Sequence, residues 1–234
     1  MAQQINPRLR ENPADIATYT IADAAHHLRM PAATVRSWLV GRPYPTTGGR
    51  KQFIPLVTMA DNEGQLLSFR DLVELHVLGV VRSHRVKVRQ IRTAIDYLHD
   101  NFDDPHPLSS RQMLTDGKDL FIEHFEKLIN ISQRGQTEMK ELLDMYLSRI
   151  QWDHAGIPIR LYPFTRDRIQ DAPQKVAIDP RIHFGDPCLA GTRIPTSIII
   201  ERYRAGDSIQ ELAEDYGRPV NEIEEAIRYE ERAA

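Results

Sequence analysis

The sequence predicts a mainly α-helical protein of the α+β class. It would have an N-terminal winged helix-turn-helix, a small α+β connector, and a C-terminal three-helix domain with a short strand and an ordered loop. The chain has 234 residues, 41% of them hydrophobic, which is enough for two small domains. Apolar residues recur at helical spacing near both ends, and proline-containing breaks at 105–107 and 171–173 separate the segments. We therefore expect a flexible tail over 1–18, a winged helix-turn-helix over 19–102, a connector over 103–174 and the C-terminal domain over 175–234.

The N-terminal domain is expected to follow the order helix, helix, hairpin, helix, helix. Thr20 is a suitable N-cap for the first helix, and Pro31 suits the first turn of the second. Turn residues on both sides of the apolar run 53–57 favour a two-stranded wing. Ser68, with Asp71 three residues later, predicts a capping box for the third helix. The expected helices cover residues 21–28, 32–39, 68–82 and 88–101.

The connector and the C-terminal domain are predicted from shorter patterns. Leu114–Ile122 indicates a β-hairpin through an Asp116-Gly117 turn. Further along the connector, apolar spacing predicts a helix near 139–150 and alternation predicts a strand over 157–164. The C-terminal domain is expected to contain a strand at 176–178, a loop over 179–193, and helices over about 196–205, 208–216 and 221–232.

The charge of the chain is unevenly distributed. The formal net charge is −3, which taken alone argues against a nucleic-acid partner. Residues 19–99, however, carry eleven basic and six acidic side chains, a net +5. Residues 176–234 carry seven basic and twelve acidic side chains, a net −5. The N-terminal end therefore suits phosphate groups, and the C-terminal end suits a protein partner.

Cysteine content and hydropathy indicate a cytoplasmic protein. Cys188 is the one cysteine, and no Cys/His cluster has the spacing of a zinc site. We therefore predict no bound metal and no cofactor. The first twenty residues contain no apolar leader, and no later window approaches eighteen uninterrupted apolar residues, so neither export nor membrane insertion is expected.

Candidate DNA-contacting residues lie near the start of the second predicted helix. If the helices over 21–28 and 32–39 bury one shared face, then Thr34, Arg36 and Ser37 point outward, where a helix-turn-helix enters the major groove. Arg36 can pair with a guanine edge or a phosphate. Contacts to phosphate from the wing would come from Arg42, Arg50 and Lys51. A helical hairpin with no DNA role is the alternative interpretation.

The segment Tyr19–Phe102 resembles the winged helix-turn-helix of MerR-like regulators. The resemblance rests on the order and spacing of the predicted elements, including Leu-Ser-Phe-Arg-Asp-Leu-Val-Glu-Leu after the wing. It implies operator DNA as a partner. The chain lacks the long coiled-coil helix and the effector-binding cysteines of those regulators, so a metal-sensing role is not expected.

The most distinctive motif begins the C-terminal domain. Ile178–Ser197 contains Asp-Pro, Phe-Gly-Asp-Pro and Gly-Thr-Arg-Ile-Pro, and Arg-Ala-Gly-Asp-Ser-Ile-Gln-Glu-Leu-Ala follows at 204–213. This stretch resembles the domain-of-unknown-function family 433. That family is similar to antitoxins of bacterial type II toxin-antitoxin pairs, and full-length relatives with a helix-turn-helix resemble VapB-type antitoxins. The resemblance implies a homodimeric repressor of its own operon, with a PIN-like ribonuclease toxin as partner.

Four residues are candidates for toxin or dimer contacts, namely Arg181, Arg193, Arg202 and Tyr203. Arg181 or Arg193 could place a guanidinium against the metal-binding acids of a PIN-like toxin. The favoured alternative is that Arg193 ties its own loop together through Asp179 or Asp186.

Two other functions remain open from the sequence. The protein could be a stand-alone transcriptional regulator without a toxin partner. It could also be a hydrolase that uses His183 and Cys188 in the 179–193 loop, although a lone cysteine is more often a buried apolar residue than a nucleophile. No P-loop, nucleophile elbow or dinucleotide fingerprint occurs, so we predict no catalytic residues and no enzyme.

Overall fold

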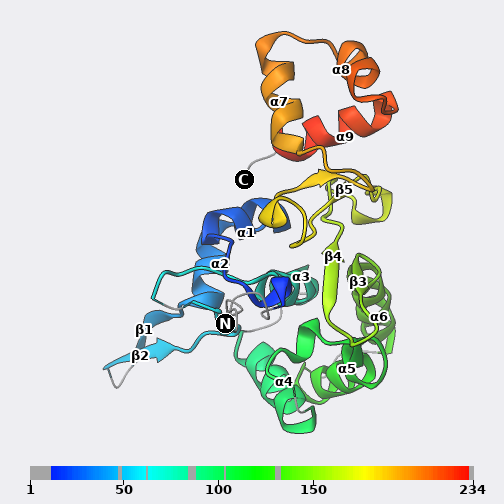
Figure 1. The fold of residues 1–234 in the computed structure, drawn as a ribbon. Coiled ribbons are helices and arrows are strands. Elements are labelled where there is room, and N and C mark those ends of the chain that lie inside the picture. Colours follow the sequence, from blue (N-terminus) through cyan, green and yellow to red (C-terminus); the bar gives the residue numbers. More distant parts are fainter. Residues whose placement is uncertain are drawn as a thin grey trace, which may run out of the picture.

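The computed structural model describes residues 12–46, 49–61, 63–83, 88–102, 104–129 and 133–231 (Figure 1). The predicted fold class is confirmed, because these residues form mostly helices with small two-stranded sheets. No helix in these ranges is long and apolar enough to cross a membrane. The N-terminal elements follow the predicted order: α1 (Ile21–Leu28), α2 (Ala32–Leu39), β1 (Arg42–Thr46), β2 (Gly49–Phe53), α3 (Phe69–Ser83) and α4 (Val88–Asn101).

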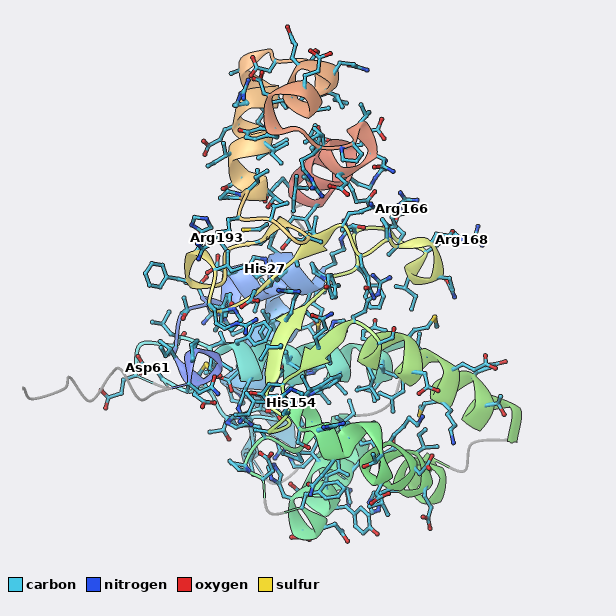
Figure 2. The ribbon with its side chains drawn as sticks, turned by 45° about the vertical axis from the view of Figure 1, so that its right-hand side comes forward. His27, Asp61, His154, Arg166, Arg168 and Arg193 are labelled. Atoms are coloured by element: carbon cyan, nitrogen blue, oxygen red, sulfur yellow. The ribbon has the colours of Figure 1, made fainter. Side chains whose placement is uncertain are left out.

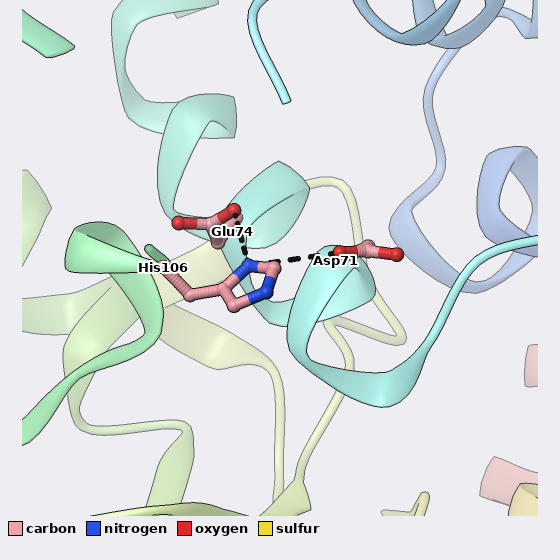
Figure 3. Close-up of side chains that lie close together, drawn as sticks. All are labelled: Asp71, Glu74 and His106. Carbon is pink, nitrogen blue, oxygen red and sulfur yellow. Dashed lines mark hydrogen bonds and ion pairs between the residues drawn. The ribbon is translucent and has the colours of Figure 1, made fainter. Parts of the chain in front are cut away.

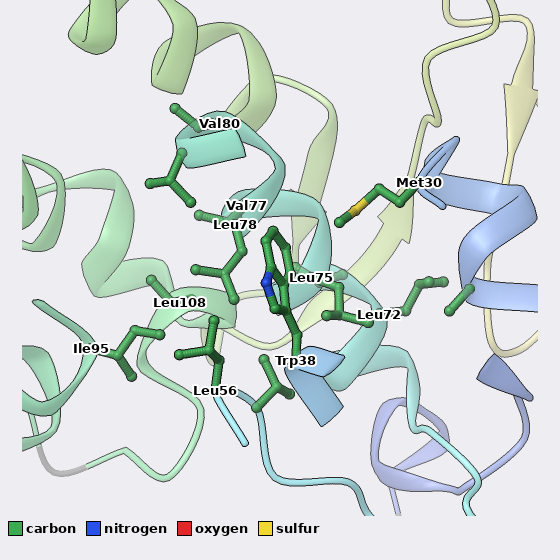
Figure 4. Close-up of a cluster of buried hydrophobic side chains, with 14 of the residues drawn as sticks. Met30, Trp38, Leu56, Leu72, Leu75, Val77, Leu78, Val80, Ile95 and Leu108 are labelled. Atoms are coloured by element: carbon green, nitrogen blue, oxygen red, sulfur yellow. The ribbon is translucent and has the colours of Figure 1, made fainter. Parts of the chain in front are cut away.

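Helix α3 runs through the centre of the larger of two hydrophobic cores. Apolar residues occupy every side of this helix, and such a helix is stable only when it is surrounded by protein. Its side chains at Leu72, Leu75 and Leu78 are completely buried, and Trp38 of α2 lies in the same cluster (Figure 4). The helix-turn-helix is therefore built directly on α3.

The connector is not a separate layer. It contains α5 (Asp116–Ile129), α6 (Gln133–Leu147), β3 (Ile150–Trp152) and β4 (Pro158–Leu161), and its apolar residues belong to the same core as the helix-turn-helix. Helix α5 packs against α4, and α6 packs against α3. The boundary that we expected near residue 102 therefore lies between elements that share one core.

The hairpin predicted for Leu114–Ile122 is wrong. Asp116 begins helix α5, and Asp119 also lies in its first turn, where a carboxylate is stabilised by the positive end of the helix dipole. Phe121 and Ile122 are buried against the core, which outweighs the turn preference of Asp-Gly. The other two connector elements are confirmed as α6 and β4.

The flexible tail predicted for residues 1–18 is wrong for residues 12–18. Residues 1–11 lie outside the described ranges. Pro13–Asp15 forms a short 3-10 helix, and Ala14 is 1% exposed. The Asp15 carboxylate forms an ion pair with Arg70, in which Oδ1 and Nε are 2.7 Å apart. The Thr18 amide donates a hydrogen bond to the Leu67 carbonyl. These contacts fix residues 12–18 on the helix-turn-helix.

The C-terminal domain begins with β5 (Val176–Ala177), which pairs with β6 (Cys188–Leu189) in an antiparallel ribbon. Helices α7 (Thr196–Ala205), α8 (Ile209–Tyr216) and α9 (Val220–Glu231) follow, close to the predicted bounds. A second core lies between them and includes Leu189, Ile199, Leu212 and Ile223, all fully buried.

Backbone pairing and side-chain contacts both join this domain to the rest of the chain. Leu161 of β4 and Ile178 exchange backbone hydrogen bonds of 3.0 and 2.8 Å, which continues the connector hairpin into the domain. In Figure 1, α1 lies beneath the β5 ribbon and α9. The helix-turn-helix is therefore in direct contact with the C-terminal domain through α1.

Candidate nucleic-acid interface and C-terminal loop

The first two helices form a close-packed pair joined by a three-residue turn. Thr20 is the N-cap of α1, as predicted, and it forms a capping box with Asp23. Arg29 ends α1 in the left-handed conformation with φ 52°, and the Met30 amide then donates to the Ala25 carbonyl. Ala24 and Ala25 are buried, so the two helices can approach closely. Two closely packed helices joined by a short turn are the expected arrangement of a helix-turn-helix.

Helix α2 presents a polar face to solvent. Val35, Trp38 and Leu39 are buried, whereas Arg36 is exposed and Thr34 and Ser37 are half-buried. The Arg36 Nη1 atom donates a long hydrogen bond of 3.4 Å to Gln65 Oε1, from the segment that follows the wing. Of the three α2 residues that were expected to point outward, Arg36 is therefore exposed, and Thr34 and Ser37 are only partly so.

The wing is an antiparallel hairpin in which Arg42 pairs with Phe53 and Pro45 pairs with Arg50. Arg42 is exposed at its base. The backbone of Arg50 and Lys51 forms β2, while their side chains lie outside the described part of the structure. Arg50 and Lys51 are thus placed by their backbone alone, whereas the Arg42 side chain is exposed.

Two contacts at the base of the wing hold it against the helices. The Leu56 amide donates to the Trp38 carbonyl at the end of α2, with 2.6 Å between nitrogen and oxygen. Arg92 of α4 donates to the carbonyls of Ile54 and Pro55. Nothing in the sequence marks Arg92 for this role, because its backbone acceptors lie nearly forty residues away along the chain.

One side of α1 packs against the C-terminal domain rather than against α2. His27 Nδ1 lies 2.7 Å from the hydroxyl oxygen of Tyr229 in α9, and the two rings stack with centroids 6.3 Å apart. Tyr19 donates a hydroxyl hydrogen bond of 3.4 Å to the Gly185 carbonyl. Burial lowers the pKa of His27 to about 4, so the imidazole is neutral at physiological pH. Figure 2 shows His27 beneath the C-terminal domain.

We predict that His27 makes the protein less stable in mild acid. The unfolded histidine takes up a proton below about pH 6.5, whereas the folded one resists protonation until about pH 4. Its contribution is therefore complete above pH 6.5 and is lost as the pH falls, by at most about 3 kcal/mol. Urea unfolding at pH 7 and pH 5 should show a smaller loss of stability in His27→Asn than in the unchanged protein. An equal loss in both proteins would contradict the prediction.

The loop after β5 is held by an arginine, but not by the one that the sequence favoured. Arg181 donates to both carboxylate oxygens of Asp179, at 2.8 and 2.6 Å, and Arg160 adds a third contact at 3.2 Å. Burial alone would raise the pKa of Asp179, but the hydrogen bonds from Arg181 hold it below its usual value. Arg181 therefore closes the loop on itself.

Arg193 is exposed at the edge of this loop (Figure 2). Its carbonyl oxygen lies 3.0 Å from His183 Nε2, a contact that fixes its backbone. Within the described ranges, its guanidinium forms no ion pair with Asp179, Asp186 or any other acid. The favoured role of Arg193 as an internal tie is therefore corrected, since Arg181 fills that role at Asp179.

The two candidates on α7 differ in their availability. Arg202 forms ion pairs of 2.6 Å with both Asp207 and Asp215, so its guanidinium is neutralised by acids of its own domain. Tyr203 is 37% exposed beside a shallow depression that is also lined by Ile227 and Arg228 of α9. Tyr203 therefore remains accessible, and Arg202 orders the end of α7.

Phe184 was missed by the sequence analysis. It is 85% exposed, and both His183 and Phe184 have left-handed backbone angles, with φ of 48° and 56°. Residues other than glycine seldom adopt this backbone conformation, so the tertiary contacts around the loop impose it. The Gly185 position fixes the turn because an added Cβ would overlap the Tyr19 hydroxyl.

Cys188 is not an activated nucleophile. It is buried in β6, and burial raises the pKa of its thiol to about 11, so the reactive thiolate is scarce at neutral pH. Its sulfur lies 3.5 Å from the Asp186 carbonyl oxygen. The hydrolase interpretation therefore lacks the group on which it depended.

Comparison with known families finds a match for the helix-turn-helix and a match for the C-terminal domain. Residues 17–95 match the family described as "Putative DNA-binding HTH domain". Residues 176–229 match the family described as "Protein of unknown function (DUF433)". The expected pairing of a helix-turn-helix with a family 433 domain is confirmed. The two matched segments are those that α1 and α9 bring into contact.

Two proteins of Mycobacterium tuberculosis are similar in sequence to this chain over nearly their full length. The chain is 28% identical over 231 residues to "Putative antitoxin VapB45", covering 91% of this chain and 93% of the relative. It is 22% identical over 225 residues to "Uncharacterized protein Rv2308", covering 92% and 90%. The crystal structure of Rv2018 superposes with a TM-score of 0.64 at 24% identity, over 91% of this chain and 98% of that one. The last similarity shows a shared fold.

Proposed function

We propose that this protein is a cytoplasmic antitoxin of a type II toxin-antitoxin system. It would bind and neutralise a PIN-like ribonuclease toxin of the VapC type and repress its own operon. The similarity over 91% of the chain to the relative named as a VapB-type antitoxin carries this proposal. The net charges of +5 at the helix-turn-helix and −5 at the family 433 domain suit DNA for one and a protein for the other.

Operator binding is assigned to α2 and the wing. Arg36, Thr34 and Ser37 would contact the major groove, and Arg42, Arg50 and Lys51 would contact phosphates. A helix-turn-helix protein of this kind reads a palindrome as a dimer, because two-fold protein symmetry matches two-fold operator symmetry. A homodimer is therefore part of the proposal.

Removal of the Arg36 guanidinium should weaken operator binding. We expect Arg36→Ala to cost about 1–3 kcal/mol of affinity for the DNA upstream of the gene, because one charged base or phosphate contact is lost. Fluorescence anisotropy at fixed salt would measure the change. Arg168→Ala is the matched control, since Arg168 is 83% exposed in the connector and carries the same charge. Equal affinities of the two variants would remove α2 from the DNA interface.

The toxin-binding surface is assigned to the family 433 loop. Arg181 and Arg202 are engaged by acids of their own domain, which leaves Arg193 to meet a carboxylate cluster on the ribonuclease. A bidentate guanidinium fits such a cluster and can take the place of a metal ion's charge. Tyr203 is the accessible aromatic candidate on α7.

We expect Arg193→Ala to weaken the complex with the ribonuclease encoded by the adjacent gene by about tenfold or more, which is 1.4 kcal/mol or more. Binding can be measured by calorimetry with an inactive ribonuclease. Arg204→Ala, at an exposed position of α7, is the control. An unchanged Kd for Arg193→Ala would assign the contact to another surface. Absence of any complex with the unchanged protein would favour a stand-alone regulator instead.

A further inference from the structure

Three side chains with metal-ligating atoms meet at the beginning of α3. Asp71 and Glu74 lie one turn apart on this helix, and His106 comes from the segment just before the 3-10 helix Pro107–Ser109 (Figure 3). His106 Nδ1 is 3.3 Å from Glu74 Oε2 and 3.7 Å from Asp71 Oδ1. All three ligand atoms lie within 4.8 Å of one another. This cluster belongs to neither the DNA-facing nor the toxin-facing surface.

The outer oxygens of both carboxylates are held in place by backbone amides. Asp71 Oδ2 accepts from the amides of Ser68 and Ala60, each at 2.9 Å. Glu74 Oε1 accepts from the Leu108 amide at 3.3 Å. These contacts orient the remaining oxygens, Asp71 Oδ1 and Glu74 Oε2, toward the His106 ring. Supporting hydrogen bonds of this kind position the ligands in protein metal sites.

Asp71 Oδ1 has no hydrogen-bond partner within the described residues, although the side chain is completely buried. A buried oxygen without a partner is costly, and the cost is greater when the group is charged. The His106 ring at 3.7 Å is beyond hydrogen-bond distance. The oxygen therefore points into the cluster and lacks a positive or donating group at close range.

Two buried carboxyl groups face a single imidazole in this cluster. Burial raises the pKa of both carboxyl groups, so their charged forms are disfavoured unless a cation binds beside them. The nearby Arg70 is engaged by Asp15 at 2.7 Å and lies 3.8 Å from Asp104. A divalent cation would neutralise both carboxylates of the cluster at once.

We propose that Asp71, Glu74 and His106 bind a divalent transition-metal ion of the Zn²⁺ class. Carboxylate oxygens and an imidazole nitrogen are ordinary ligands of such ions, at bond lengths of about 2.0–2.2 Å. Ligand atoms at 3.3 and 3.7 Å from one another are compatible with a shared ion at these lengths. The His106 side chain is 23% exposed, which gives the ion access from solvent.

Binding of the metal ion would connect the connector, α3 and the segment that follows the wing. His106 would fix the start of the connector to α3, and Asp71 already holds the segment that leads from the wing through Ala60 to Ser68. The ion is thus a structural one, and its stabilisation of the folded protein follows from binding the native state alone. The proposal does not depend on a toxin partner.

The test is a titration of the untagged, metal-free protein with Co²⁺, followed by displacement with Zn²⁺. We expect one equivalent of Co²⁺ to produce visible d-d absorption, Zn²⁺ to remove it, and Zn²⁺ to raise the melting temperature. Glu74→Gln and His106→Gln should weaken Co²⁺ binding by about tenfold or more, because each removes a ligand. His154→Gln, which alters an exposed histidine of the connector, should leave binding unchanged.

Two results would overturn the proposal. The first is a metal-free protein that shows neither Co²⁺ absorption nor a shift in melting temperature with Zn²⁺, which would make the cluster an ion pair of protonated His106. The second is an equal Co²⁺ affinity in Glu74→Gln and in the His154→Gln control. Circular dichroism of Glu74→Gln, which keeps the shape of the side chain, verifies that the variant is folded.

Discussion

Replacement of Trp38 by alanine is expected to lower the free energy of unfolding by about 3–5 kcal/mol and to abolish operator binding. Trp38 is 4% exposed and lies in the cluster that joins α2 to α3 (Figure 4). Its removal would take away apolar area and leave a cavity between these helices, and both effects destabilise. Urea unfolding followed by circular dichroism would measure the loss.

Val40→Ala provides the matched control for this experiment. Val40 follows Trp38 by two residues but is 36% exposed, so its truncation should cost well under about 1 kcal/mol. A loss for Trp38→Ala that is no larger than the loss for Val40→Ala would mean that α2 does not depend on α3 for its position. In that case the recognition helix would not be built as described.

A loss of similar size, about 3–5 kcal/mol, is expected for Tyr229→Ala. Tyr229 is 1% exposed on α9, packs edge-on against His26 with ring centroids 5.2 Å apart, and contacts His27 through its hydroxyl. Truncation would open a cavity between the helix-turn-helix and the family 433 domain. Calorimetry should then resolve two melting transitions where the unchanged protein has one, because a buried contact between the two parts of the chain is lost.

Tyr229→Phe distinguishes packing from hydrogen bonding at the same position. It keeps the ring and removes only the hydroxyl, so we expect a loss of about 1 kcal/mol and a single transition. If Tyr229→Ala melts in one transition with little loss of stability, the α1-α9 contact does not couple the two domains.

The helices of the N-terminal and C-terminal domains were predicted well because their boundaries depend on local signals. Thr20 and Ser208 both form capping boxes, with Asp23 and Glu211, and such signals are visible within four residues of sequence. Gly206 and Gly217 end α7 and α8 in the left-handed conformation. Local chemistry was sufficient for these elements.

The connector was predicted poorly because distant contacts decide its structure. Asp116-Gly117 is a turn signal in isolation, yet burial of Phe121 makes it the first turn of α5. The sequence also gave no indication that the connector and the helix-turn-helix share one core. Tertiary packing overrides local preference when an amphipathic segment can complete a larger core.

The candidate site was only partly predictable for the same reason. The exposed position of Arg36 follows from helical spacing within α2. The choice between Arg181 and Arg193 as the partner of Asp179 depends on loop geometry, and spacing cannot supply it. The cluster at Asp71 and Glu74 is completed by His106, more than thirty residues later, so the search for closely spaced metal ligands could not find it.

The most direct test of the proposed function is an RNA-cleavage assay with the ribonuclease encoded by the adjacent gene. The full-length protein is added at increasing molar ratios, and cleavage of a labelled RNA is followed over time. If the protein is the cognate antitoxin, cleavage should fall with each addition and stop near the stoichiometric ratio, with a complex recovered by gel filtration. Undiminished cleavage at a large excess of the protein, with no complex, would contradict the antitoxin function.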